Sequence, residues 1–129
     1  MPKKVAGKAK IIAAVRKLAL SFPEASERAS HGAPAWFAGK KQFAALADNH
    51  HGDGEFALWL AAPDGAQQML IDSEPANFYR PAYVGHLGWV AVRIDKAPWN
   101  TVASVIESAY RTRASKKQLA ALDAQNKSD

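Results

Sequence analysis

Residues 80–95 read RPAYVGHLGWVAVRID, and the second half of this stretch alternates as a β-strand does. Successive side chains of a strand point to opposite faces, so every second residue shares a face. The two sets are Val90, Val92 and Ile94 on one face and Trp89, Ala91 and Arg93 on the other. We therefore predict a strand here, and we expect the rest of the chain to pack around it.

The loop before this strand, Pro81–Gly88, contains glycines, a proline, an aromatic residue and a histidine. Loops held by a rigid strand are common positions for binding residues. We expect the functional surface of the protein to lie near this loop.

The composition indicates one domain with its own core. The chain has 129 residues, of which 48% are hydrophobic, and this length suits a single core. Cysteine is absent, which excludes disulfides and thiolate metal sites. No apolar run reaches the roughly 18 residues of a membrane span, and the basic N-terminus lacks the features of a secretory signal. We expect a cytoplasmic protein with no membrane partner.

The net charge of +5 is unevenly distributed. Residues 1–20 and 76–129 are basic, whereas residues 49–75 carry acids and no base. Such a distribution suits an anionic partner on one side of the fold, and it suits equally well lysines that only keep the ends solvated.

The periodicity predicts an N-terminal helix followed by an antiparallel meander. Apolar residues recur every three to four positions from about Lys8 to Ser21, before Pro23. Short strand-like runs follow between Arg28 and Leu60, and they are separated by turns. In the run that ends at Leu60, the alternation predicts aromatic surface on both sides of the sheet.

Three further helices are predicted. A short one runs from about Gly65 to Ile71, with Asp64 and Gln67 as a capping box. The next opens at Pro98, and its apolar stripe is Trp99, Val102, Ile106, Ala109, Tyr110 and Arg113. The last begins at Ser115, with Gln118 completing a second capping box.

The predicted fold class is α+β, a single domain over residues 8–124 with an antiparallel sheet. The N-terminal helix and the helix over 99–113 are expected to cover one face of the sheet, beside a short middle helix and a last C-terminal helix. Residues 1–7 and 125–129 are expected to be flexible tails.

No catalytic or cofactor motif emerges. His50, His51 and Asp53 lack the spacing of metal ligands, so we interpret them as a polar hairpin loop. Gly85 and Gly88 precede a strand instead of following one, which is the wrong order for a phosphate-binding loop. Serine does not occur in a nucleophile motif, and His31 is interpreted as a structural hydrogen-bonding residue. We expect no enzyme activity, no cofactor and no metal.

The remaining candidates are basic and aromatic residues. Cations suit phosphates and rings suit bases, although the same rings could serve only in packing. The candidate nucleic-acid-binding residues are Arg80, Tyr83, His86, Trp89, Arg93, Arg111, Arg113, Lys116 and Lys117.

Several short motifs occur in an order that resembles the MmcQ/YjbR family. They are Phe22-Pro23, Gly32 to Phe37, Gly39 to Ala44, Pro81 to Tyr83, Gly88 to Val90 and Glu107 to Arg111, and the resemblance spans about residues 10–123. It implies a compact α+β fold. It also implies DNA binding, because the family fold is similar to the double-wing DNA-binding domain of a phage transcription factor, although fold alone does not determine function.

We therefore expect a non-enzymatic binding module. The favoured partner is nucleic acid, bound weakly, with steep salt dependence and little sequence preference, through a basic and aromatic surface. The alternative is a protein-interaction or regulatory adaptor that uses the aromatic face of the sheet. A small-molecule enzyme is the third option, and it would require a deep pocket with converging polar groups.

Overall fold

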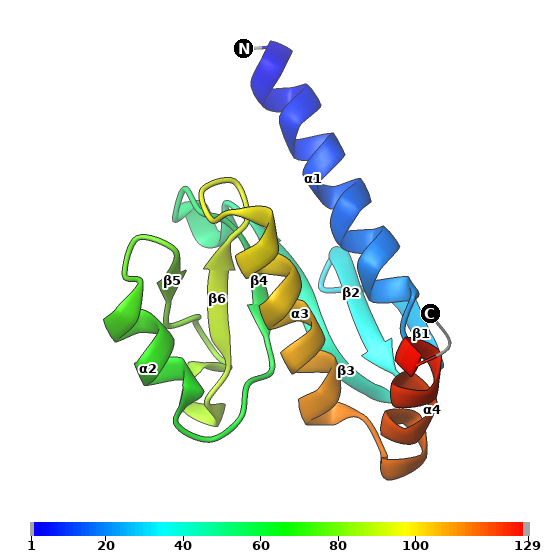
Figure 1. The fold of residues 1–129 in the computed structure, drawn as a ribbon. Coiled ribbons are helices and arrows are strands. Elements are labelled where there is room, and N and C mark those ends of the chain that lie inside the picture. Colours follow the sequence, from blue (N-terminus) through cyan, green and yellow to red (C-terminus); the bar gives the residue numbers. More distant parts are fainter. Residues whose placement is uncertain (1, 128–129) are drawn as a thin grey trace.

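The computed structural model describes residues 2–127, with side chains from residue 7 onward (Figure 1). The elements are α1 (Pro2–Leu20), β1 (Ala25–Ser30), β2 (Ala33–Ala38), β3 (Lys41–Asp48), the 3-10 turn η1 (His50–Gly52), β4 (Phe56–Leu60), α2 (Ala66–Ser73), β5 (Phe78–Tyr79), the 3-10 turn η2 (Gly85–Leu87), β6 (Val90–Arg93), α3 (Trp99–Arg113) and α4 (Lys116–Lys127). No helix among these residues is long and apolar enough to cross a membrane.

The strands form one antiparallel sheet in the order β1-β2-β3-β4-β6-β5. The predicted α+β class and single domain are therefore confirmed. Two strands, β1 and β5, were not predicted from the sequence. β1 reads ASERAS, which has little β-propensity, and β5 has only two residues. Both are edge strands, and both exist because a neighbouring strand pairs with them.

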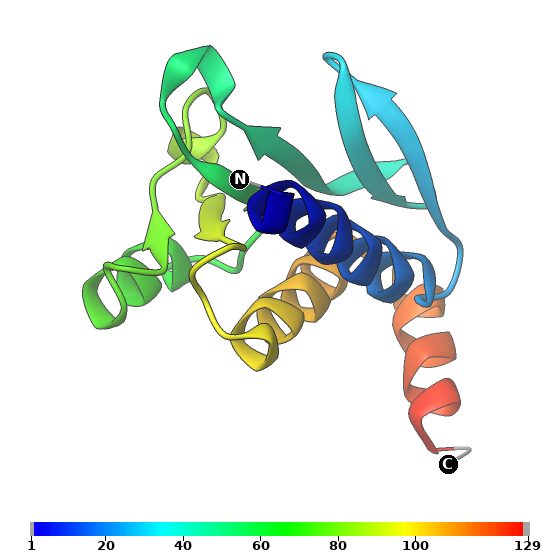
Figure 2. The ribbon, with the colours of Figure 1, turned by 90° about the horizontal axis from the view of Figure 1, so that it is seen from above.

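Helices α1 and α3 cover one face of the sheet, as predicted (Figures 1 and 2). Between them and the sheet lies the core, whose largest buried side chains include Trp36, Phe43, Leu58, Ile106 and Tyr110. The stripe of α3 is also confirmed at Val102, Ile106, Ala109 and Tyr110, which are buried, whereas Trp99 stays 45% exposed at the first turn.

The other face of the sheet, which we call the open face, has no α-helix of the described residues over it (Figure 2). The strand registers place one row of side chains across this face from edge to edge. The row is Arg28, Ala35, Ala45, Trp59, Ala91 and Tyr79. Trp59 is half-buried there, while Phe56, Leu58 and Leu60 point to the helices, so aromatic side chains occur on both faces as predicted.

Both terminal helices are longer than the sequence predicted. α1 begins at Pro2, before the expected Lys8, and α4 runs to Lys127, beyond the expected end at 124. The mobility expected for residues 1–7 and 125–129 stays a prediction, and residues 1, 128 and 129 lie outside the described residues.

Of the two predicted capping boxes, one is confirmed and one is wrong. Ser115 Oγ accepts from the backbone N–H of Gln118 at 3.1 Å, and Gln118 Oε1 accepts from the N–H of Ser115 at 2.9 Å. Asp64 does not cap α2, because Gly65 is the N-cap residue and no side chain caps it. Gln67 is turned away instead, and its amide donates to the carbonyls of Gly85 and Trp89. Gln67 thus holds the loop before β6.

Candidate functional site

Arg93, a predicted phosphate contact, is engaged within the protein. Its guanidinium forms a two-point ion pair with Glu55, with both N–O distances 2.9 Å. It also donates to the carbonyls of Pro75 and Ala76 and lies over the ring of Tyr79, 4.8 Å from its centroid. The hydrogen bond from Arg93 lowers the pKa of the Glu55 carboxyl, and burial raises the pKa of Tyr79. Arg93 holds β6 to the segment before β5.

Arg111 and Arg113 are also engaged in contacts within the fold. Arg111 donates to Glu107 at 3.0 Å and to Asp123 at 3.2 Å, so it ties α3 to α4. The hydrogen bond to Glu107 raises the pKa of Arg111. Arg113 donates to the backbone carbonyl of Gln42 at 3.0 Å and joins α3 to β3.

Lys116 and Lys117 lie at the start of α4 and are exposed. The turn between β2 and β3 reaches the same place, because Gln118 Nε2 lies 3.0 Å from where a Cβ on Gly39 would be. Glu24 joins the two: its Oε1 accepts from Gln118 Nε2 at 2.7 Å, and its backbone carbonyl accepts from the N–H of Gly39 at 3.0 Å.

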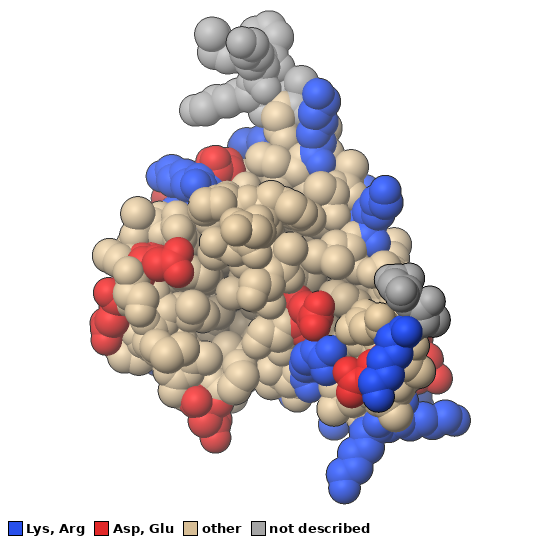
Figure 3. All heavy atoms as spheres, viewed as in Figure 1, with Lys and Arg blue, Asp and Glu red and all other residues tan. Residues whose placement is uncertain are grey.

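The turn that carries Lys40 and Lys41 and the start of α4, which carries Lys116 and Lys117, therefore meet at Gln118, and we call these four lysines the basic corner. All four are exposed, and within the described residues none of them forms an ion pair. Figure 3 shows Lys and Arg side chains projecting from the end of the molecule where α4 lies. The sequence pointed to only half of this corner, since lysines far apart in the chain carry no local signal of their proximity.

Arg80 and His86 lie on the loop around η2, away from the basic corner at the opposite side of the sheet (Figure 1). Both are exposed, and the stem of Arg80 lies against Gly85, where a Cβ would be 2.7 Å from Arg80 Cγ. Trp89 is only partly exposed and packs against the core. The predicted residues are thus split between two ends of the sheet.

Tyr83, a predicted nucleic-acid-binding residue, lies in a group of rings with His50 and His51, which sequence analysis interpreted as a polar hairpin loop. Tyr83 is 67% exposed, and its hydroxyl lies 2.9 Å from His51 Nε2. The ring of His50 lies 5.7 Å from the centroid of Tyr83 and 4.8 Å from that of Trp59. We call Tyr83, His50, His51 and Trp59 the ring cluster; it begins on the open face and extends outward from it.

The backbone at the ring cluster is unusual. Asn49, His51 and Tyr83 have φ values of 54°, 51° and 63°, in the left-handed region that non-glycine residues rarely occupy. Such strained residues concentrate at functional sites. His50 and His51 pack edge to face at 4.1 Å, and among the described residues no set of three or more His, Cys, Asp or Glu could hold a metal ion.

At the other end of the open face, Arg28 lies over Phe37. Its Cζ is 3.8 Å from the ring centroid, and Arg28 is exposed, with no ion pair within the described part of the chain. Phe37 is followed almost directly by the turn that carries Lys40. Sequence analysis missed this pair, because the strand that carries Arg28, β1, was itself not predicted.

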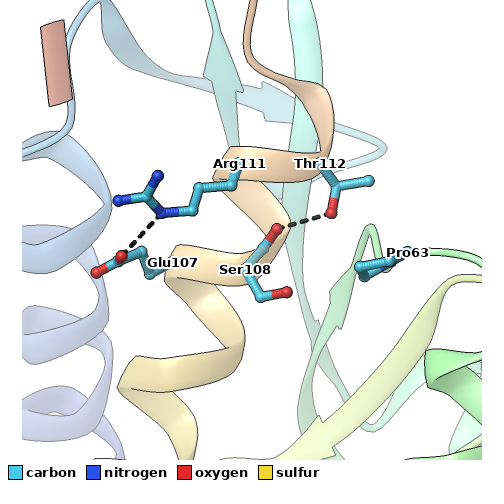
Figure 4. Close-up of a pocket in the computed structure, with 5 residues that line it drawn as sticks. All are labelled: Pro63, Glu107, Ser108, Arg111 and Thr112. Carbon is cyan, nitrogen blue, oxygen red and sulfur yellow. Dashed lines mark hydrogen bonds and ion pairs between the residues drawn. The ribbon is translucent and has the colours of Figure 1, made fainter. Parts of the chain in front are cut away.

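A hollow of about 480 Å³ lies on the helix-covered side, between α3 and the segment after β4 (Figure 4). It is lined by Pro63, Glu107, Ser108, Arg111 and Thr112. Arg111 and Glu107 neutralise each other, and Thr112 Oγ1 donates to the carbonyl of Ser108 at 2.7 Å. Its polar groups are therefore largely engaged with one another and do not converge on a ligand, as those of an enzyme pocket would.

A protein-family model described as YjbR matches residues 20–112, which is more than half of the chain. The matched segment includes the whole sheet and almost all of α3, and it ends before α4. No curated protein and no solved structure matches the chain.

Proposed function

Because the chain belongs to the YjbR family, we propose that it is a non-enzymatic, cytoplasmic module that binds nucleic acid with little sequence preference. The single observation that carries this proposal is the basic corner. Lys40, Lys41, Lys116 and Lys117 come from two distant segments, are exposed and form no ion pairs among the described residues. Phosphates are the anions that such a set of cations can contact together.

The chemistry of the corner favours weak, salt-dependent binding. Each lysine that contacts a phosphate releases counterions, so the affinity falls as salt rises. Lysine contacts to phosphates position a protein without reading base edges. Arg93 and Arg111 already bind carboxylates, so we do not count them among the phosphate contacts.

The proposal is tested by fluorescence anisotropy with a labelled DNA at two salt concentrations. Lys116→Ala/Lys117→Ala and Lys40→Ala/Lys41→Ala should each weaken binding for all sequences alike. Each should also flatten the slope of log K against log salt by about one unit per lost contact. The matched control is Lys10→Ala/Lys17→Ala, which removes the same charge from exposed positions on α1. If the wild-type protein fails to bind even at low salt, the proposal is wrong.

The open face supports a second candidate, a protein-interaction or regulatory adaptor. It carries the half-buried aromatic residues Trp59, Phe37 and Tyr79, and no described α-helix covers it. An apolar sheet face without a covering layer is a common feature of protein-binding surfaces. Purified protein that binds no nucleic acid at low salt would favour this candidate.

A further inference from the structure

We propose that the open face binds single-stranded nucleic acid, with bases stacked on the ring cluster and phosphates toward Arg28 and the basic corner. This inference rests on the proposed function and names its substrate class. It starts from the row of side chains across the sheet, in which Trp59 stands in line with Arg28 and with three alanines.

The three alanines have short side chains, so the surface between the larger side chains of the row is lower there. Ala35 and Ala91 are fully buried and Ala45 is half-buried, so among these alanines only Ala45 presents surface to a flat ligand. The row crosses every strand, and neighbouring strands lie about 4.8 Å apart, so it spans about 24 Å. OB folds, which bind single strands, hold about 4 to 16 nucleotides each, and a row of this length suits the lower part of that range.

The ring cluster provides stacking surface that is already ordered. Tyr83 exposes 67% of its surface, yet its hydroxyl is held by His51 and its ring lies against His50. A ring that is fixed before binding loses little conformational entropy when a base stacks on it. Stacking on a tyrosine or tryptophan tolerates every base, because every base has a π-face.

The charges on the open face favour different contacts at its two ends. Arg28 stands at the β1 edge without an ion pair in the described residues, and Phe37 beneath it leads into the turn of Lys40. Near the ring cluster, Glu55 is neutralised by Arg93, and Asp53 is exposed. One part of a bound strand is therefore held through its phosphates at the β1 and basic-corner end, and another part of the same strand is held by base stacking at the ring-cluster end.

Duplex DNA fits this surface less well. Its bases are paired and stacked on one another, so they cannot lie on Tyr83 or Trp59 without being unpaired. Sequence reading in a duplex also needs an element that enters a groove, usually a helix. The α-helices of the described residues lie on the other side of the sheet (Figure 2).

The inference is tested by anisotropy with a labelled thymidine strand of about 12 nucleotides and with a duplex of the same length. The wild-type protein should bind the single strand more tightly. Tyr83→Ala should weaken single-strand binding by about tenfold and leave duplex binding nearly unchanged. Tyr83→Phe keeps the ring and should retain most of the affinity. Met69→Ala is the control, because Met69 is a large exposed side chain on α2.

A second variant, at Ala45, tests whether the strand lies across the middle of the open face, independently of stacking on the ring cluster. Ala45→Glu places a carboxylate in the middle of the open face and should abolish the preference for the single strand, whereas Ala45→Gln, of similar size, should reduce it less. Because Ala45 is only half-buried, both variants should fold, which circular dichroism checks. Photo-crosslinking with a 4-thiothymidine strand should label peptides that contain Trp59 or Tyr83.

The outcomes separate this inference from the proposed function. If single strand and duplex bind equally, Tyr83→Ala has no effect and only the basic-corner variants weaken binding, the inference fails and the proposed function stands. If neither nucleic acid binds at low salt, both fail, and a protein partner becomes the occupant of the open face.

Discussion

Arg93 and Glu55 form a two-point ion pair across β6 and the start of β4, with N–O distances of 2.9 Å. Their side chains are only 18% and 23% exposed. An arginine that could have been a free phosphate contact therefore has a structural role, since it also bonds the carbonyls of the segment before β5. This ion pair therefore helps to hold β6 to the segment before the short edge strand β5.

Removing this arginine should destabilise the fold without affecting phosphate binding directly. Arg93→Ala leaves Glu55 and the carbonyl of Pro75 without their donor, and we expect a loss of about 2 kcal/mol in the free energy of unfolding. Urea denaturation measures it, with Lys10→Ala as a surface control. A variant as stable as the wild type would contradict the structural role.

The same pair predicts how stability depends on pH. Arg93 lowers the pKa of Glu55 in the folded protein, whereas an unfolded glutamate titrates near pH 4.3, an approximate model value. The stabilisation is therefore fully present above that pH, and it is lost as the pH falls through the lower folded pKa. Glu55→Gln should be less stable than the wild type at pH 7, and the gap should shrink toward pH 3. Thermal melts of both proteins between pH 3 and pH 7 measure this difference. A difference in stability that does not change with pH would rule out a contribution from the ionisation of Glu55.

Tyr110 and Tyr83 allow a comparison of how much a tyrosine hydroxyl contributes to the free energy of unfolding when it is buried and when it is exposed. Tyr110 is fully buried and donates to the carbonyl of Pro23 at 2.6 Å, whereas Tyr83 is exposed. Tyr110→Phe leaves a carbonyl unsatisfied and should cost about 1 to 2 kcal/mol. Tyr83→Phe should stay within about 0.5 kcal/mol of the wild type. Equal costs in chemical denaturation would show that burial does not control the effect.

Gly39 should tolerate alanine less well than Gly32. Both have positive φ, 59° and 79°, but only at Gly39 would a Cβ meet a neighbour, Gln118 Nε2 at 3.0 Å. The conformational strain of about 1 kcal/mol is common to both positions, so any excess at Gly39 reports the contact that assembles the basic corner. In a Gln118→Ala background the excess should disappear. Identical costs for the two glycines would mean that the turn can move away from α4.

Deleting residues 1–7 should leave the melting temperature nearly unchanged. Among the described side chains, the ion pairs of α1 begin with Lys8, which contacts Asp48 at 3.1 Å. The deletion keeps that contact and the buried Val15 and Ala19. A drop of many degrees in a thermal melt would mean that the first turns of α1 contribute packing energy.

Local patterns predicted most of the elements. The alternation of Val90 and Val92, the stripe of Val102 and Ile106 and the Ser115 cap are properties of neighbouring residues, and each is found in the structure. The Asp64 cap failed because Gln67 has distant acceptors, Gly85 and Trp89, that a local motif does not include.

The sequence by itself determined the α+β class, the antiparallel sheet and the family, because these follow from periodicity and motif order. Only the tertiary structure decided which cations are free. Arg93 is paired with Glu55, 38 positions away, whereas the turn of Lys40 is held near the start of α4 by the hydrogen bonds of Glu24 to Gly39 and Gln118. Whether a charge faces solvent or a partner depends on long-range packing, and that packing is set by the whole core and not by any short stretch of the chain.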